Sequence, residues 1–127
     1  MVVLDRPYAP AKPEHVKQAL ESLNEPRALD LNPLKLMRVM AGNGTPAELR
    51  ALLVDVVGEL SDSRSERDAE AGRLLLDYYV RKAGSHEVVM RRNHISRPTY
   101  FRRLQRGYML VAQQLDSVSD FAEWFPL

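Results

Sequence analysis

The chain contains no cysteine, and its histidines are His15, His86 and His94 alone. The lack of cysteine excludes a disulfide framework and a thiolate metal site, and it fits a reducing compartment. The spacing of the three histidines suits no common metal-binding motif. We therefore expect no metal and no other cofactor, and we expect a cytoplasmic protein.

Long apolar runs are missing as well. No run approaches the roughly 20 residues of a membrane span, and the opening MVVLDRPYAP lacks the basic start and apolar stretch of a signal peptide. The motifs G-x-S-x-G, H-E-x-x-H and G-x-x-x-x-G-K-S/T do not occur. The segment Gly42-Asn43-Gly44-Thr45 has no lysine and no preceding strand, so it predicts a turn. We expect neither an enzyme nor a membrane protein.

The alternation of β-branched residues that marks strands is also absent, and apolar residues recur with a period near 3.6. This predicts an all-α protein of about six helices. Three helices are expected in the first half of the chain: Glu14 to Leu23, a short helix capped by Asn32, and a helix from a capping box at Thr45 to Leu60. Three more are expected after it: about Ser65 to Lys82, a helix capped by Ser85 that ends at a turn at Asn93, and a long helix from Arg97 past Leu115. Asn24-Glu25-Pro26, Gly42-Asn43-Gly44 and Ala83-Gly84 are the expected stops.

Charge is distributed unevenly along the chain. Residues 1–77 carry 10 Lys or Arg and 13 Asp or Glu, whereas residues 78–115 carry 8 basic residues and 1 acidic residue. Between Val88 and Leu115 there are six arginines and no acid. A basic segment flanked by acidic ones produces a directional field of the kind that steers binding to polyanions. The alternative is a solvated basic face without a ligand.

We divide the chain into four parts. They are an N-terminal arm (residues 1–12), a helical bundle that offers a dimerisation or partner surface (13–82), a helix-turn-helix with a long C-terminal recognition helix (83–119), and an aromatic tail (120–127). Phe121, Trp124 and Phe125 of the tail either cover the protein's own core or dock on a second copy or another protein.

The helix-turn-helix is predicted from the stretch Ser85 to Leu115. Two hydroxyl residues, Ser85 and Ser96, stand where they can cap a short and a longer helix, and four residues, Asn93 to Ser96, form the turn between them. A short helix, a tight turn and a second helix rich in basic residues is the outline of a DNA-binding helix-turn-helix.

The residues of this stretch also resemble a known pattern. Glu87, Val89, Ile95, Ser96, Tyr100, Leu104 and Gly107 occupy matching places in the sigma factor region-four-like helix-turn-helix family of bacterial DNA-binding domains. The resemblance covers about a quarter of the chain. Met90 and Asn93 depart from it, since the family has a small residue at the first position and an apolar one at the second. Either the second helix packs at a different angle, or Asn93 turns outward.

In such a motif the second helix enters the major groove of double-stranded DNA. With Tyr100 and Leu104 directed inward, the side predicted to read bases carries Arg97, Pro98, Phe101, Arg102 and Gln105. The residues predicted to contact phosphates are Ser85 (through its backbone N–H), His86, Arg91, Arg92, Arg103 and Arg106. Phe101 has two interpretations, a contact with a thymine methyl group or a loose contact with the core.

These patterns predict a sequence-specific DNA-binding transcriptional regulator. Because a single module of this size buries little surface on DNA, we expect a homodimer or a part of a larger assembly, RNA polymerase being one such assembly. The alternative is a protein-interaction module that kept the fold and no longer reads DNA. Met90, Asn93 and the acidic N-terminal half motivate that alternative.

Overall fold

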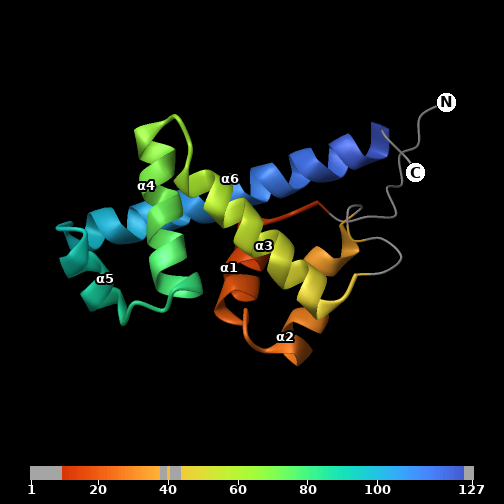
Figure 1. The fold of residues 1–127 in the computed structure, drawn as a ribbon, viewed down its shortest axis with the longest axis horizontal. Coiled ribbons are helices and arrows are strands. Elements are labelled where there is room, and N and C mark those ends of the chain that lie inside the picture. Colours follow the sequence, from red (N-terminus) through yellow and green to blue (C-terminus); the bar gives the residue numbers. More distant parts are fainter. Residues whose placement is uncertain (1–9, 38–39, 41–43, 125–127) are drawn as a thin grey trace.

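A computed structural model describes residues 10–37, 40 and 44–124, with side chains described as far as residue 118. Within these ranges the chain forms helices and no strand, which confirms the all-α prediction. Helix α6 (Arg97–Trp124) runs along most of the length of the molecule (Figure 1).

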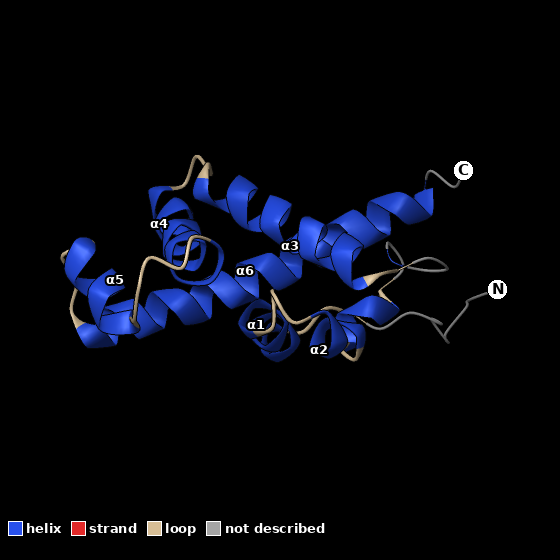
Figure 2. Ribbon diagram, turned by 60° about the horizontal axis from the view of Figure 1, so that its bottom comes forward, coloured by secondary structure: helices blue, strands red, loops and turns tan. Residues whose placement is uncertain are grey.

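The other helices pack around α6. Helices α3 (Pro46–Ser61) and α4 (Glu66–Leu75) cross it on one side, while α1 (Pro13–Glu21) lies against its other side (Figure 2). Helix α2 (Pro26–Asp30) packs on α3, and α5 (His86–Arg92) lies at the N-terminal end of α6. The basic start of α6 lies at one end of the molecule, beside α5 and away from α2 (Figure 1).

Proline and asparagine organise the segment after α1. Helix α1 ends at Glu21, before the predicted Leu23, and Pro26 of the predicted stop opens the five-residue helix α2, which we did not predict. Proline suits that first position because its missing N–H would have no partner within the helix. Asn32 caps as predicted, accepting the Leu34 N–H at 2.8 Å, although the element it opens is the 3-10 helix η1 (Pro33–Leu36).

The predicted caps Thr45 and Ser85 are confirmed, and Ser65, predicted as the start of its helix, caps it as well. Thr45 accepts the Glu48 N–H at 3.1 Å, Ser65 accepts the Asp68 N–H at 3.4 Å, and Ser85 accepts the Val88 N–H at 3.3 Å. Each hydroxyl satisfies a backbone donor that the first turn of a helix leaves without a partner. Local sequence therefore explains where α3, α4 and α5 begin.

The end of the fourth predicted helix differs from expectation. Helix α4 passes at Leu76 into the π-helical turn η3 (Leu76–Val80), in which the Arg81 N–H bonds the Leu76 carbonyl at 2.8 Å. The helix ends at Val80, before the predicted Lys82. Lys82 itself adopts a left-handed φ of 51°, and the Ala83 N–H returns to the Asp77 carbonyl at 2.9 Å.

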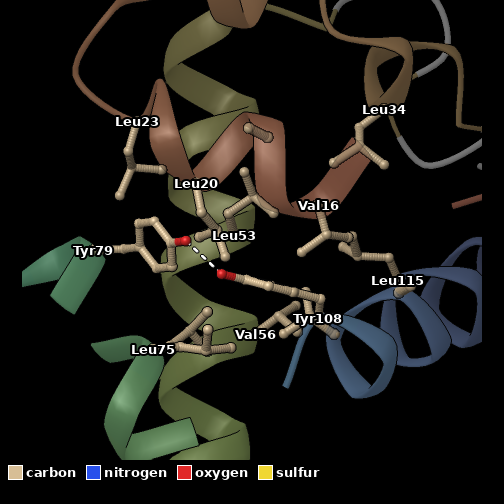
Figure 3. Close-up of a cluster of buried hydrophobic side chains, with 14 of the residues drawn as sticks. Val16, Leu20, Leu23, Leu34, Leu53, Val56, Leu75, Tyr79, Tyr108 and Leu115 are labelled. Atoms are coloured by element: carbon tan, nitrogen blue, oxygen red, sulfur yellow. Dashed lines mark hydrogen bonds between the residues drawn. The ribbon is translucent and has the colours of Figure 1, made fainter. Parts of the chain in front are cut away.

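One core serves both the N-terminal bundle and the C-terminal helices. Val16, Leu20, Leu53 and Leu115 are all buried and come from α1, α3 and α6 (Figure 3). At the centre the hydroxyls of Tyr79 and Tyr108 lie 2.5 Å apart in a buried hydrogen bond. Because α6 supplies part of this core, its orientation is set by the bundle.

The two ends of the chain lie largely outside the described residues. Of the predicted N-terminal arm, Ala11 is buried, and its N–H bonds the Asp116 carboxylate of α6 at 2.8 Å. Helix α6 continues without a break to Trp124, beyond the predicted start of the tail at 120. The predicted roles of the side chains of Phe121, Trp124 and Phe125 lie outside the described residues. So do Gly42 and Asn43 of the predicted stop at Gly42-Asn43-Gly44.

Candidate nucleic-acid interface

Helix α5 and the start of α6 are joined by the four residues Asn93 to Ser96. His94 takes a left-handed φ of 55°, which reverses the chain within this short distance. The side chain of Ile95 packs against the core, and the Ser96 hydroxyl donates to the Thr99 hydroxyl at 3.0 Å. The predicted turn is therefore present at the predicted residues.

The two positions that depart from the family pattern both have partners within the protein. Met90 is buried in the core. Asn93 ends α5, and its Nδ2 donates to the Val89 carbonyl at 2.8 Å, one turn earlier in the same helix. A half-buried amide that bonds the last turn of its own helix is satisfied, so it does not force α5 and α6 apart.

Behind the turn lies an aromatic cluster formed by Tyr78, His86, Tyr100 and Phe101. The His86 ring stacks on Tyr78 with a centroid distance of 3.9 Å, and its Nδ1 lies 2.7 Å from the Tyr100 hydroxyl. Phe101 meets the His86 ring edge-on at 5.1 Å. Burial lowers the pKa of His86 and raises that of Tyr100, because a low-dielectric site disfavours each charged form.

The aromatic cluster changes two site assignments. The ring of His86, predicted to contact phosphate, instead stacks within the cluster and bonds Tyr100. Phe101, predicted on the base-reading side, is half-buried and packs against the core, which is the second of the two roles considered for it. Both corrections have the same cause, since side chains of η3, α5 and α6 meet in a cluster that sequence spacing does not reveal.

The outer face of α6 carries the rest of the base-reading set. Tyr100 and Leu104 are fully buried, as predicted, and this orientation turns Pro98, Arg102 and Gln105 to the exposed side. No acidic residue occurs on α6 before Asp116. This face therefore combines an arginine fork and an amide on consecutive turns of one helix.

Arg97 lies at the edge of this face. Its Nη1 is 3.2 Å from Glu87 Oε1, and its guanidinium lies 5.0 Å from the centre of the Phe101 ring. Both members of the ion pair are largely exposed, and solvent screening makes such pairs weak. Arg97 is therefore oriented by α5 but can exchange Glu87 for another acceptor.

The six residues predicted to contact phosphates divide into two groups. Arg91 and Arg92 are exposed in the last turn of α5, and neither forms an ion pair with any residue in the described ranges. Ser85 is exposed as well, with its hydroxyl accepting from Val88. The other three, His86, Arg103 and Arg106, are held by partners inside the protein.

Two arginines of α6 bond carboxylates of α4. Arg103 Nη1 donates to Glu70 Oε1 at 3.1 Å, and Arg106 donates to Asp68 Oδ1 from Nε at 3.1 Å and from Nη2 at 2.7 Å. All four side chains are partly buried. Arg103 and Arg106 thus join α6 to the bundle, a role that their place in the basic stretch did not suggest.

The same two arginines line a pocket of about 250 Å³ between α4 and α6. We call it the arginine pocket, and its lining residues are Arg67, Thr99, Arg102, Arg103 and Arg106. Arg67 was not among the predicted site residues, because it lies in the acidic part of the chain, at least 32 residues before the others. Nothing in the sequence near Arg67 indicates this proximity.

No protein-family model, curated protein or solved structure matches this chain.

Two further observations bear on the kind of site. No group of three or more His, Asp or Glu side chains in the described ranges is arranged to hold a metal ion. None of the helices in those ranges is long and apolar enough to cross a membrane. What the described surface does offer is concentrated arginine around the start of α6, and guanidinium groups bind phosphates and the edges of bases.

Proposed function

We propose that this protein is a sequence-specific DNA-binding transcriptional regulator that places the start of α6 in the major groove. The observation that carries the proposal is the exposed, acid-free face of Pro98, Arg102 and Gln105 on α6, beside the exposed Arg91 and Arg92 of α5. A resemblance of Ser85 to Val111 to the sigma region-four-like helix-turn-helix supports it. A regulator of this kind works in the cytoplasm, beside bacterial DNA.

The chemistry of the exposed side chains suits some of them to reading bases and others to contacting phosphates. Arg102 has the planar fork that pairs with the O6 and N7 atoms of guanine, and Gln105 has the amide that pairs with adenine. Arg91 and Arg92 have unpaired charge within the described ranges and suit phosphates, which fix position without reading sequence. Arg97 can join either group by releasing Glu87.

Selection of bound duplexes from a random DNA pool tests the proposal directly. We expect an enriched site whose affinity falls steeply with salt, because each phosphate contact releases counterions. Arg102→Ala should weaken the selected site by about 1–3 kcal/mol and relax specificity at one base pair. Arg50→Ala is the matched control, since Arg50 is an exposed arginine of α3 that lines a different pocket. Equal effects of the two variants, or no enrichment, contradict the proposal.

The small size of the interface bears on assembly. A single module buries on the order of 600–1,000 Å² on DNA, which is seldom enough for tight specific binding. We therefore propose that the protein acts as a homodimer or within a larger assembly such as RNA polymerase. A selected site with two half-sites about one helical turn apart supports the homodimer, whereas a single half-site supports the larger assembly.

A protein-interaction module is the second candidate function. An apolar pocket of about 490 Å³, lined in part by Leu23, Pro26, Leu29 and Pro46, opens where α1, α2 and α3 meet. Leu31 and Leu36, which follow α2, expose 84% and 60% of their surface. Co-purification of one stoichiometric protein partner, with no DNA binding at low salt, would favour this function over the first.

A further inference from the structure

The arginine pocket brings together parts of the chain that carry opposite overall charge. Arg67 comes from α4 in the acidic part of the sequence, and the three arginines of α6 come from the basic stretch. Four guanidinium groups around one pocket repel one another. Asp68 and Glu70 offset two of these charges, whereas Arg67 and Arg102 form no ion pair within the ranges that the structure describes. An excess of positive charge remains.

The two paired arginines keep capacity for a ligand. A guanidinium has five N–H donors in a rigid fork. Glu70 accepts from only one nitrogen of Arg103, and Asp68 accepts from two nitrogens of Arg106. The carboxylates therefore hold both guanidiniums in place while most N–H donors stay available. Thr99 adds a hydroxyl that accepts from Ser96 and so keeps its own proton to donate.

Each residue that lines the pocket carries N–H or O–H donors, and the size of the pocket limits the ligand. The pocket holds about 250 Å³, below the roughly 300–1,000 Å³ of sites that enclose a whole small molecule. No apolar side chain lines it. A small group with several acceptor oxygens and negative charge fits these conditions, and a phosphate group has that chemistry.

We propose that the arginine pocket binds a phosphate group. Arg67 and Arg102 supply the net charge, and Arg103 and Arg106 supply N–H donors that α4 has already positioned. The phosphate comes either from a nucleic-acid backbone or from free phosphate and phosphorylated small molecules. Only the first source rests on the proposed function. In that case Arg67 of the bundle contacts the DNA strand beside the groove that α6 enters.

Titration of the full chain with inorganic phosphate tests the site without DNA. Arginine Nε–Hε and backbone amide resonances are followed by NMR, with sodium chloride at matched ionic strength as the reference. We expect saturable shifts at Arg67, Thr99, Arg102 and Arg106 that chloride does not produce. Arg67→Ala should weaken phosphate binding about tenfold, equivalent to about 1.4 kcal/mol and typical of a lost charge-assisted hydrogen bond, and Arg50→Ala should leave it unchanged.

A second measurement identifies the source of the phosphate. Duplex binding is measured by fluorescence anisotropy over a range of salt for the wild type, Arg67→Ala, Arg67→Lys and Arg50→Ala. If the backbone supplies the phosphate, Arg67→Ala weakens every duplex alike and lowers the salt slope by about 1. Arg67→Lys, which keeps the charge and loses the fork, should lie between the wild type and Arg67→Ala.

The outcomes separate this inference from the proposed function. Saturable phosphate binding with unchanged duplex affinity supports the pocket with a free phosphate as its ligand. Absence of duplex binding by the wild type contradicts the proposed function, and the phosphate titration then decides the pocket alone. Phosphate shifts no larger than those of chloride, together with identical duplex binding by Arg67→Ala and Arg50→Ala, overturn the inference. Arg67 is exposed, so thermal melting should show that its variants fold.

Discussion

Arg106 of α6 holds Asp68 of α4 with two hydrogen bonds to the same carboxylate oxygen, at 3.1 and 2.7 Å. The pair joins residues 38 apart in the sequence and is partly buried, with side-chain exposures of 34% and 23%. It binds the proposed DNA-reading helix to the bundle. The Asp68 carboxylate also offsets one positive charge of the arginine pocket. The ion pair should therefore raise the stability of the fold and lower the affinity of the pocket for an anion.

Asp68→Asn tests both effects of this ion pair, on stability and on phosphate affinity. We expect the free energy of unfolding to fall by up to about 1 kcal/mol, because the charge of the pair is lost while solvent screens part of it. Phosphate affinity should rise, since Arg106 keeps its charge with no carboxylate beside it. Glu66→Gln is the matched control, because Glu66 lies in the same first turn of α4 but pairs with Arg73 at 2.8 Å. Equal changes in phosphate affinity for both variants would contradict the prediction.

Gly72→Ala should destabilise the protein by about 1–3 kcal/mol, the usual cost of an overpacked interior. A Cβ at Gly72 would lie 2.4 Å from the Ser61 nitrogen and 2.7 Å from the Leu60 carbonyl carbon, and backbone atoms cannot turn aside. Gly58→Ala, with nothing within 4 Å of the new Cβ, should stabilise α3 by up to about 1 kcal/mol. Urea unfolding of both variants measures the contrast, and changes of the same sign would argue against the close approach of α3 and α4.

Tyr108→Phe should lower the free energy of unfolding by about 1–3 kcal/mol, because the buried Tyr79 hydroxyl loses its partner. Burial, together with the hydrogen bond to Tyr108, raises the pKa of Tyr79 above its ordinary value, so this hydroxyl stays neutral. Combining Tyr79→Phe with Tyr108→Phe removes both polar atoms and should recover part of the loss. A double-mutant cycle measures the coupling, and purely additive losses would rule out the bond as its source.

The stability of the protein should depend on His86 in mildly acidic solution. Burial lowers the pKa of His86, so the unfolded chain binds a proton more readily than the folded one. The His86 contribution is therefore complete above the ordinary pKa of about 6.5 and is lost as the pH falls below it. Thermal melts of the wild type and His86→Gln between about pH 7.5 and pH 5.5 should converge toward the acidic end. Parallel curves would show that His86 titrates alike in both states.

The caps show how much of the fold follows from neighbouring residues. Thr45, Ser65 and Ser85 were predicted to start helices and do so, since a cap needs only a hydroxyl and an N–H three residues later. The burial of Tyr100 and Leu104 was equally predictable from helical spacing. Helix α2 was missed because five residues are too few to show a period.

The candidate site was less predictable than the fold. Exposure of Arg91, Arg92 and Arg102 agrees with the predicted outward faces of α5 and α6. The positions of His86 and Phe101 do not, because the space they fill is closed by Tyr78 of η3. A helical wheel predicts the direction in which a side chain points, but it does not predict which residues of other helices pack against that side chain.

Short-range chemistry in this protein determined the helices, their starts, their apolar faces and the concentration of arginine on α6, because each depends on residues within a few positions of one another. Long-range packing alone decided which arginines of the basic stretch are held by carboxylates and which line the arginine pocket. Asp68 and Glu70 meet Arg106 and Arg103 across 38 and 33 residues, and Arg67 reaches the same pocket from the acidic part of the chain. The physical reason is that an ion pair or a pocket requires proximity in space, which for these residues exists only once α4 has packed on α6.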